Sequence, residues 1–178
     1  MIPISEYATV SEDASLYEAV KCLNQIRKIA PNNQYPQVTV LVYDTSNHIC
    51  GKISPLDIIR GLEPKYRLLG HSDPLSTIGL SRFGLSPDFL KSLIVQYNLW
   101  DVPLEELIQK ASALKVKEFM YTPLEGEYVR IDSPLSEAIH QIVLGHHQSL
   151  LVLSGKDIVG VLRLVDIFSK VCDLVAAD

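Results

Sequence analysis

The chain has 178 residues, of which 47% are hydrophobic, and its 16 basic and 21 acidic side chains give a formal net charge of −5. This is enough apolar material for one domain or two small ones, which excludes disorder throughout. No apolar run approaches the ~20 residues needed to cross a bilayer. The N-terminus also lacks a signal-peptide pattern, so we expect a cytoplasmic protein without membrane contact.

Charge and cysteine usage narrow the function further. The acidic balance opposes the phosphate attraction that drives nonspecific binding to nucleic acid. Three cysteines, Cys22, Cys50 and Cys172, have no C-x-x-C spacing, which argues against a disulfide scaffold or a zinc site.

Residues 1–62 predict a first unit of mixed α and β structure. Apolar residues recur at helical spacing over residues 15–29, and the polar, proline-bearing stretch 27–37 predicts a surface loop. Residues 38–43 and 49–53 flank turn formers, a pattern typical of a β-hairpin. A serine, a proline and an acid at Ser54, Pro55 and Asp57 then predict the start of a helix through Leu62.

Residues 63–115 separate this unit from a second one. Helical patterns cover residues 89–97 and 104–114, and the segment is rich in leucine and balanced in charge. This composition favours a helical insertion packed against one unit over a flexible linker. Two helices could also form a DNA-reading helix-turn-helix, but the neutral charge favours packing or partner contact.

Residues 116–178 predict a second unit with the same order of elements. An extended piece at 128–131 precedes a helix at 135–144, strands at 150–153 and 158–162, and a helix at 165–175. Each unit is therefore expected to be β-α-β-β-α, and the fold class to be α/β in the broad sense, more narrowly α+β.

The two units also share residues in register. Residues 51–59, GKISPLDII, return as GVLRLVDIF at residues 160–168, so that Gly51 and Gly160 each precede an aspartate by the same spacing. Upstream, Leu16 and Ala19 align with Leu135 and Ala138. A doubled strand-to-helix corner indicates a doubled structural unit.

These motifs resemble the CBS domain family, named after cystathionine β-synthase, whose members occur as tandem pairs. The family pattern G-x-x-[ST]-x-x-D is similar to Gly51, Ser54 and Asp57, and VKEFM at 116–120 is similar to the common opening of a repeat. The second copy has Arg163 in place of the hydroxyl residue, and both copies lack the frequent proline of the central strand. The resemblance implies two repeats packed with pseudo-twofold symmetry.

The resemblance further implies that an adenosyl ligand is sensed, without chemical change, in a cleft between the repeats. AMP, ADP, ATP or S-adenosylmethionine are the expected ligands, and no cofactor is required. Asp57 would accept hydrogen bonds from ribose hydroxyls, and Ser54 would reach ribose or phosphate. The expected apolar walls are Thr9, Val10, Val40, Leu41 and Ile53.

A second site would contain Asp166, Arg163 and the extended piece that ends at Ile131. Asp166 could take the ribose while Arg163 pairs with a phosphate, although Arg163 could instead block the site or hold Asp166 in a salt bridge. Ser54 and Asp57 also fit a capping box that needs no ligand, and Asp166 fits an acid placed at a helix dipole.

No other pattern predicts catalysis. The histidines His140, His146 and His147 lack companion metal ligands at defined spacing, and no serine, cysteine or lysine carries a nucleophile signature. We therefore expect neither an enzyme nor a metal site. The resemblance implies a regulatory module that forms a homodimer through its helices, and we expect a separate effector protein as its partner. The alternative is a dimerisation scaffold or protein-interaction module that binds no nucleotide.

Overall fold

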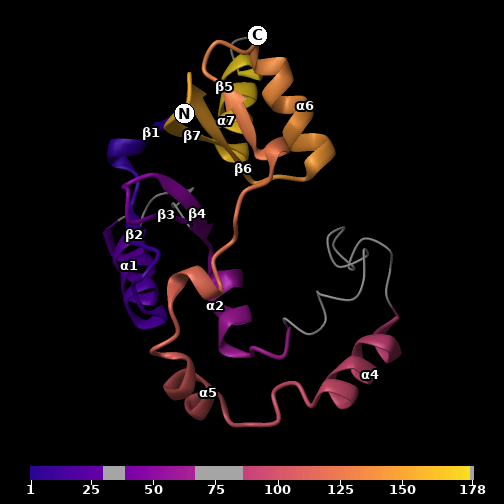
Figure 1. Cartoon of the computed structure of the whole chain (residues 1–178). Coiled ribbons are helices and arrows are strands. Elements are labelled where there is room, and N and C mark those ends of the chain that lie inside the picture. Colours follow the sequence, from indigo (N-terminus) through magenta and orange to yellow (C-terminus); the bar gives the residue numbers. More distant parts are fainter. Residues whose placement is uncertain (30–38, 67–85, 177–178) are drawn as a thin grey trace.

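The fold was obtained as a computed structural model, which describes residues 1–29, 39–66 and 86–176. Within these ranges two small sheets each carry helices (Figure 1). The predicted loop at 27–37 and the first residue of the strand expected at 38–43 fall largely outside the described residues. The same holds for the middle of the segment 63–115.

The first repeat has the predicted order of elements. Its sheet runs β2-β3-β4, with β2 parallel to β3 and β3 antiparallel to β4. The elements are β2 (Thr9–Ser11), α1 (Leu16–Ile29), β3 (Val40–Tyr43), β4 (Ile49–Ile53) and α2 (Pro55–Leu62). The start of α1 is fixed by Ser15 and Glu18, because the main-chain amide of Ser15 donates to the Glu18 carboxylate at 2.7 Å.

The second repeat has the same order and the same strand directions, with β5 parallel to β6 and β6 antiparallel to β7. Its elements are β5 (Tyr128–Arg130), α6 (Leu135–Gly145), β6 (Ser149–Ser154), β7 (Asp157–Arg163) and α7 (Leu164–Val175). Both hairpins carry a β-bulge at equivalent places, after Val42 and after Val152. The doubled α+β fold is confirmed.

Each repeat lends a short segment to the sheet of the other. The strand β1 (Ile2–Pro3) lies antiparallel to β7, with Ile2 opposite Val161 and Pro3 opposite Gly160. In the same way Tyr121, in the stretch of the second repeat before β5, forms an antiparallel bridge with Lys52 on β4. The sequence analysis did not predict this exchange, which joins the two repeats through main-chain hydrogen bonds.

Three apolar clusters hold the fold together. One lies in each repeat, and the third joins the two sheets through Tyr7, Leu41, Leu151 and Val161. Burial of these side chains places the repeats face to face, as the expected pairing requires.

The core of the first repeat is the larger because residues 111–120 pack onto it. Val116 and Ala111 are buried in that core, and Leu114 accepts a hydrogen bond from the amide of Leu16 at 2.8 Å. As a result Leu16 is 3% exposed, whereas its equivalent Leu135 is 48% exposed.

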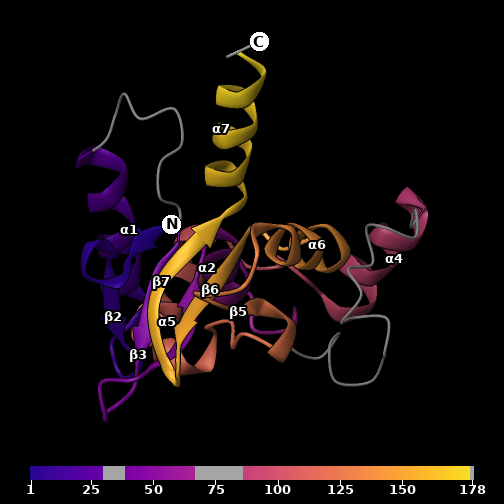
Figure 2. The same ribbon diagram turned by 90° about the horizontal axis from the view of Figure 1, so that it is seen from above.

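The remaining described helices are α4 (Pro87–Tyr97) and α5 (Leu104–Ala111). The helix α5 contacts α2, while α4 lies apart from both sheets (Figures 1 and 2). Figure 2 also shows α7 projecting from the end of β7, and Ile167 is its buried residue. No helix among the described residues is long and apolar enough to cross a membrane.

Candidate functional site

Ser54 and Asp57 form a capping box at the start of α2. The Ser54 hydroxyl and main-chain amide donate to one Asp57 carboxylate oxygen at 2.7 and 2.8 Å, and the Asp57 amide donates back to the serine oxygen at 3.4 Å. Asp57 is 7% exposed. The arrangement presents a buried acid at the positive end of a helix dipole, where a carboxylate is stabilised.

The equivalent corner of the second repeat is closed by an ion pair. The guanidinium of Arg163 donates to both Asp166 carboxylate oxygens, from Nε at 3.1 Å and from Nη2 at 2.5 Å, and the Arg163 amide adds a further bond at 3.2 Å. Burial alone would raise the pKa of Asp166, but the hydrogen bonds from Arg163 outweigh it and the pKa is lowered. Of the roles considered for Arg163, the structure contains the salt bridge.

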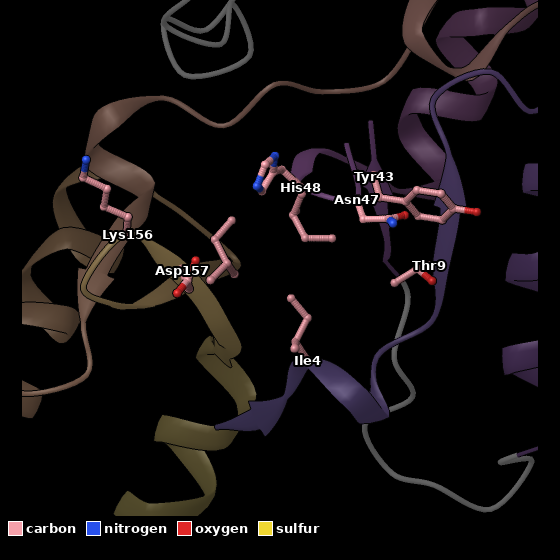
Figure 3. Close-up of a pocket in the computed structure, with 9 residues that line it drawn as sticks. Ile4, Thr9, Tyr43, Asn47, His48, Lys156 and Asp157 are labelled. Atoms are coloured by element: carbon pink, nitrogen blue, oxygen red, sulfur yellow. The ribbon is translucent and has the colours of Figure 1, made fainter. Parts of the chain in front are cut away.

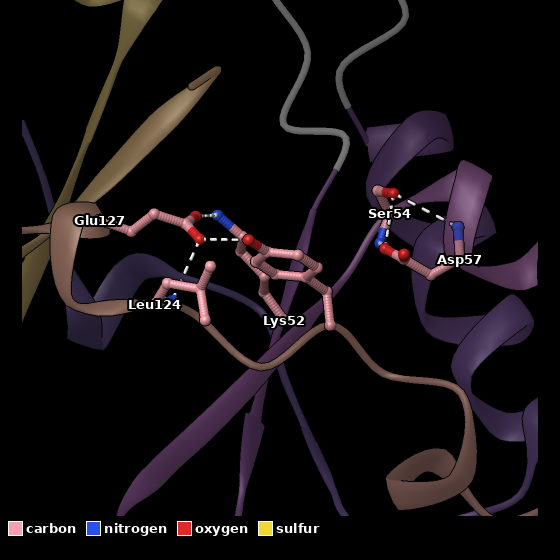
Figure 4. A network of polar contacts seen from close by, with 6 residues as sticks. Lys52, Ser54, Asp57, Leu124 and Glu127 are labelled. Carbon is pink, nitrogen blue, oxygen red and sulfur yellow. Dashed lines mark hydrogen bonds and ion pairs between the residues drawn. The ribbon is translucent and has the colours of Figure 1, made fainter. Parts of the chain in front are cut away.

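A buried ionic network lies beside the first corner (Figure 4). The Glu127 carboxylate, at 1% exposure, accepts hydrogen bonds from the Lys52 ammonium, the Tyr121 hydroxyl and, at 3.2 Å, the Leu124 amide. The Lys52 nitrogen also lies 5.1 Å from the centre of the Tyr121 ring. Lys52 belongs to the first repeat and Glu127 to the second, so the network ties the repeats together.

Each helix-start aspartate is electrostatically coupled to a tyrosine that precedes the other repeat. The pKa of Tyr121 is raised by burial, by its bond to Glu127, and by the negative charge of Asp57. The pKa of Tyr7 is raised to about 12 by burial, against the charge of Arg163 and with a further rise from Asp166. Asp57 follows five residues after Lys52, which bridges Tyr121, and Asp166 follows six residues after Gly160, which lies opposite Pro3. Both aspartates are thus close in the chain to a strand that pairs with the other repeat.

Most of the expected apolar wall residues are buried inside the fold. Val10, Val40 and Ile53 are packed in the core of the first repeat, with Val40 and Ile53 at 0% exposure. Because core packing occupies these side chains, they offer no surface to a ligand in this structure. Leu41 belongs to the cluster between the sheets, and Ile131, at 54% exposure, continues β5 through a bond to the Leu153 carbonyl.

Thr9 lines a pocket at the other end of the strands, between the tips of the two hairpins (Figure 3). The pocket has a volume of about 550 Å³. Its apolar residues are Ile4, Ile49 and Ile158, and its polar ones are Thr9, Tyr43, Asn47, His48, Lys156 and Asp157. Asp57 and Asp166 do not line it, so the pocket is separate from the two corners.

The described residues contain no group of three or more histidine, cysteine or acidic side chains able to hold a metal ion. His146 ends α6 in a left-handed conformation with φ 53°, and His147 packs its ring against Gly145. Among the described residues, no hydrogen bond links either histidine to Ser54 or Asp57.

The two repeats share one fold, and each has an aspartate in the first turn of its last helix, so the chain is a tandem-repeat protein. Comparison with known families gives the same result. The sequence model described as CBS domain matches residues 1–64 and 116–173. These matches cover more than half of the chain, which therefore belongs to the CBS domain family as a tandem pair. No match was found among curated proteins.

Solved structures share the fold at low sequence identity. The CBS domain of a CBS domain containing membrane protein from Sphaerobacter thermophilus is 18% identical, with a TM-score of 0.56 over 95% of this chain and 87% of that one. A structure of CBSX2 in complex with AMP is 16% identical, with a TM-score of 0.57 over 98% and 93%. The cytosolic domain of the Mg2+ channel MgtE in complex with ATP is 16% identical, with a TM-score of 0.52 over 94% and 46%.

Lys52, Tyr121 and Glu127 were missed by the sequence analysis. Lys52 and Glu127 are 75 residues apart in the chain. Lys52 occupies a variable position of the G-x-x-[ST]-x-x-D pattern, and Glu127 stands in no motif. The one available signal for Lys52 was a charged residue within the otherwise apolar β4 strand. Successive side chains of a strand point to opposite faces, so a charged residue at this position is expected on the face away from the core.

Proposed function

We propose that the chain is a non-catalytic regulatory module that binds an adenosyl nucleotide where its two repeats meet. One observation carries the proposal: Asp57 and Asp166 each stand in the first turn of a helix that directly follows a strand paired with a segment of the other repeat, β4 with Tyr121 and β7 with β1. A ligand bound at either aspartate would touch both repeats and so report on their arrangement.

Asp57 has the chemistry for the ribose. A carboxylate can accept hydrogen bonds from both ribose hydroxyls, and the main-chain amides of a helix start favour a nearby anion. One Asp57 oxygen is bonded to Ser54, so a ligand would share or replace these bonds. The binding free energy is then reduced by the cost of opening the capping box.

The second corner differs because Arg163 already pairs with Asp166. A phosphate would compete with Asp166 for the guanidinium, which forms strong paired bonds with either anion. We infer that this corner binds a charged phosphate group better than a bare nucleoside.

The solved relatives lend support by analogy. One was solved with AMP and another with ATP, so the fold can accommodate adenine nucleotides.

A second candidate function, a dimerisation scaffold, is favoured by exposed apolar side chains on the helices. The helices α2, α6 and α7 expose Leu56, Ile59, Leu135, Ile139, Val143, Leu144, Leu164, Phe168, Val171, Leu174 and Val175. We propose that these faces serve a homodimer and that a separate effector protein reads its state. The two functions are compatible, and the scaffold alone requires no nucleotide.

Titration calorimetry with AMP, ADP, ATP and S-adenosylmethionine tests the proposal. We expect heat from at least one ligand, a loss of that heat in Asp57→Asn or Asp166→Asn, and unchanged heat in Asp157→Asn, which alters the hairpin pocket instead. Light scattering of the same samples gives the oligomeric state. If none of the four ligands binds and the chain is dimeric, the scaffold function holds and nucleotide sensing is wrong.

A further inference from the structure

The far end of α2 is fastened to the α4–α5 segment by a set of contacts that we call the clamp, made by Glu63, Lys65, Tyr66, Trp100 and Asp101. Glu63 directly follows α2 and is 1% exposed. Its two carboxylate oxygens accept the main-chain amides of Trp100 at 2.8 Å and Lys65 at 3.2 Å. A buried acid bonded to main-chain amides fixes the path of both segments.

Two side chains complete the clamp. The Lys65 ammonium donates to the Asn98 carbonyl at 2.6 Å and to the Asp101 carboxylate at 2.7 Å. The Trp100 indole donates to the Tyr66 hydroxyl at 3.0 Å, and the two rings meet edge to face with centroids 6.1 Å apart. These contacts join residues that are more than 30 positions apart in the chain, as the separations of 33 to 37 residues show.

The clamped turn is held in a costly backbone conformation. Asn98 and Trp100 have φ values of 49° and 57°. A bulky residue such as tryptophan rarely adopts positive φ, and this conformation persists only where surrounding contacts enforce it. Loss of a clamp contact would therefore let this turn relax to a different path.

The same short helix carries the proposed nucleotide site at its other end. The helix α2 has eight residues, so its ends lie about 12 Å apart. Asp57 is in its first turn, and Glu63 caps its last. α2 also contacts α5 and α1 directly, which leaves it little freedom to absorb a displacement without moving a neighbour.

We propose that α2 couples the two ends, so that a nucleotide at Ser54 and Asp57 loosens the clamp and releases the α4–α5 segment. This inference rests on the proposed function of that corner. A ribose that takes the Asp57 carboxylate removes the capping bonds from Ser54, and the first turn of α2 shifts. The displacement reaches Glu63 and weakens the hydrogen bond that its carboxylate accepts from the Trp100 amide. The α4–α5 segment is thus the element whose state a partner would read.

Coupling between two sites is reciprocal, because the same free-energy difference links both equilibria. A weakened clamp must therefore strengthen nucleotide binding. We expect Tyr66→Phe and Lys65→Ala to bind the nucleotide about fivefold or more tightly than the natural chain, in keeping with usual coupling strengths. Lys110→Ala is the matched control, since it removes the same charge and the exposed Glu106 pair on α5 but none of the hydrogen bonds of the clamp.

Trp100 provides a second readout, because it is the one tryptophan of the chain. The indole is excited at the red edge of its absorption, where adenine does not absorb, and AMP, ADP, ATP and S-adenosylmethionine are added in turn. Binding should shift the indole emission to longer wavelength and speed amide hydrogen exchange in residues 104–111. In Tyr66→Phe the emission starts red-shifted and should change less.

Calorimetry on the same samples separates the possible outcomes. Heat with an unchanged Trp100 signal, unchanged exchange in α5 and equal affinities in Tyr66→Phe and Lys65→Ala overturns the coupling and leaves the nucleotide site intact. Slower exchange in α5 on binding also overturns it. If none of the four ligands gives heat, the proposed function fails and the coupling fails with it.

Discussion

Met120 lies against the backbone of Gly51 so closely that a β-carbon at position 51 would come within 2.6 Å of the Met120 sulfur atom. The second repeat has the same relationship, because a β-carbon on Gly160 would lie 2.7 Å from the Ile2 carbonyl and 3.0 Å from the Met1 side chain. The repeated glycine therefore admits the segment that the other repeat contributes.

Alanine at either glycine should destabilise the fold. Overpacking typically costs about 1–3 kcal/mol. Gly160→Ala should cost more than Gly51→Ala, because its β-carbon meets the Ile2 carbonyl at 2.7 Å, whereas the nearest atom at Gly51 belongs to the flexible Met120 side chain and the Tyr121 carbonyl lies at 3.2 Å. Urea unfolding measures the loss. Gly126→Ala is the control, since no atom lies within 4 Å of its β-carbon position; equal stability of all three variants would contradict the close crossing.

Removing one partner of the Lys52–Glu127 pair should be far worse than removing both. The side chains of Lys52 and Glu127 are 17% and 2% exposed. Lys52→Met leaves a buried carboxylate without its cation, at a cost of about 3–5 kcal/mol. The double variant Lys52→Met with Glu127→Gln should recover much of this loss in a double-mutant cycle. Additive losses would show that the pair does not interact.

Acid should weaken the fold through Glu127 and Asp166. Burial tends to raise the pKa of each, but the bonds from Lys52 and Tyr121, and from Arg163, lower both pKa values overall. Their contribution to the free energy of unfolding is complete above the unfolded pKa, about 4, and is lost as pH falls through the lower folded values. The free energy of unfolding, measured in urea between neutral pH and pH 2, should change less with pH in Glu127→Gln and in Asp166→Asn than in the natural chain.

The same linkage predicts the opposite trend in Lys52→Met. Without the ammonium, burial is expected to raise the Glu127 pKa above its unfolded value. Stability from the protonated acid is then present at low pH and lost as pH rises through the raised pKa. The variant should be more stable near pH 5 than at pH 8, and a stability that instead rises with pH would count against a buried, unpaired Glu127.

The two helix caps Ser54 and Ser86 should differ in their effect on global stability. Each accepts a main-chain amide of its helix, at 3.4 and 3.2 Å. Ser54→Ala should cost about 1 kcal/mol, because α2 buries Ile58, Gly61 and Leu62 against the core. Ser86→Ala should leave the urea midpoint nearly unchanged, since α4 can fray without opening the core. Equal shifts would place α4 in the same cooperative unit as α2.

The repeated elements could be predicted because their signals are local. Serine, proline and acid at Ser54, Pro55 and Asp57 fix the start of α2, and the structure contains the expected capping box. The hairpins follow from β-branched runs around turn residues. The strand β1 was missed because two residues, Ile2 and Pro3, carry no periodicity and pair with a partner far along the chain.

The environment of each side chain was harder to predict than its secondary structure. Leu16 and Leu135 align in sequence, yet Leu16 is buried and Leu135 is exposed, because residues that precede the second repeat cover the first. Val40 and Ile53 fit the expected apolar walls by residue type, but strand alternation turns them into the core. The Glu63–Trp100 bond spans 37 residues, and no sequence pattern marks it.

The two exchanged segments, β1 and Tyr121, decide whether the repeats can fold as separate fragments. A gene divided after α2 would encode one fragment that carries β1 without its acceptor β7, and another that carries Tyr121 without its acceptor Lys52. Each product would expose an unpaired strand and lose half of the inter-sheet apolar cluster. Mixing the fragments should restore a folded complex, so the pieces would behave as complementing halves instead of independent proteins.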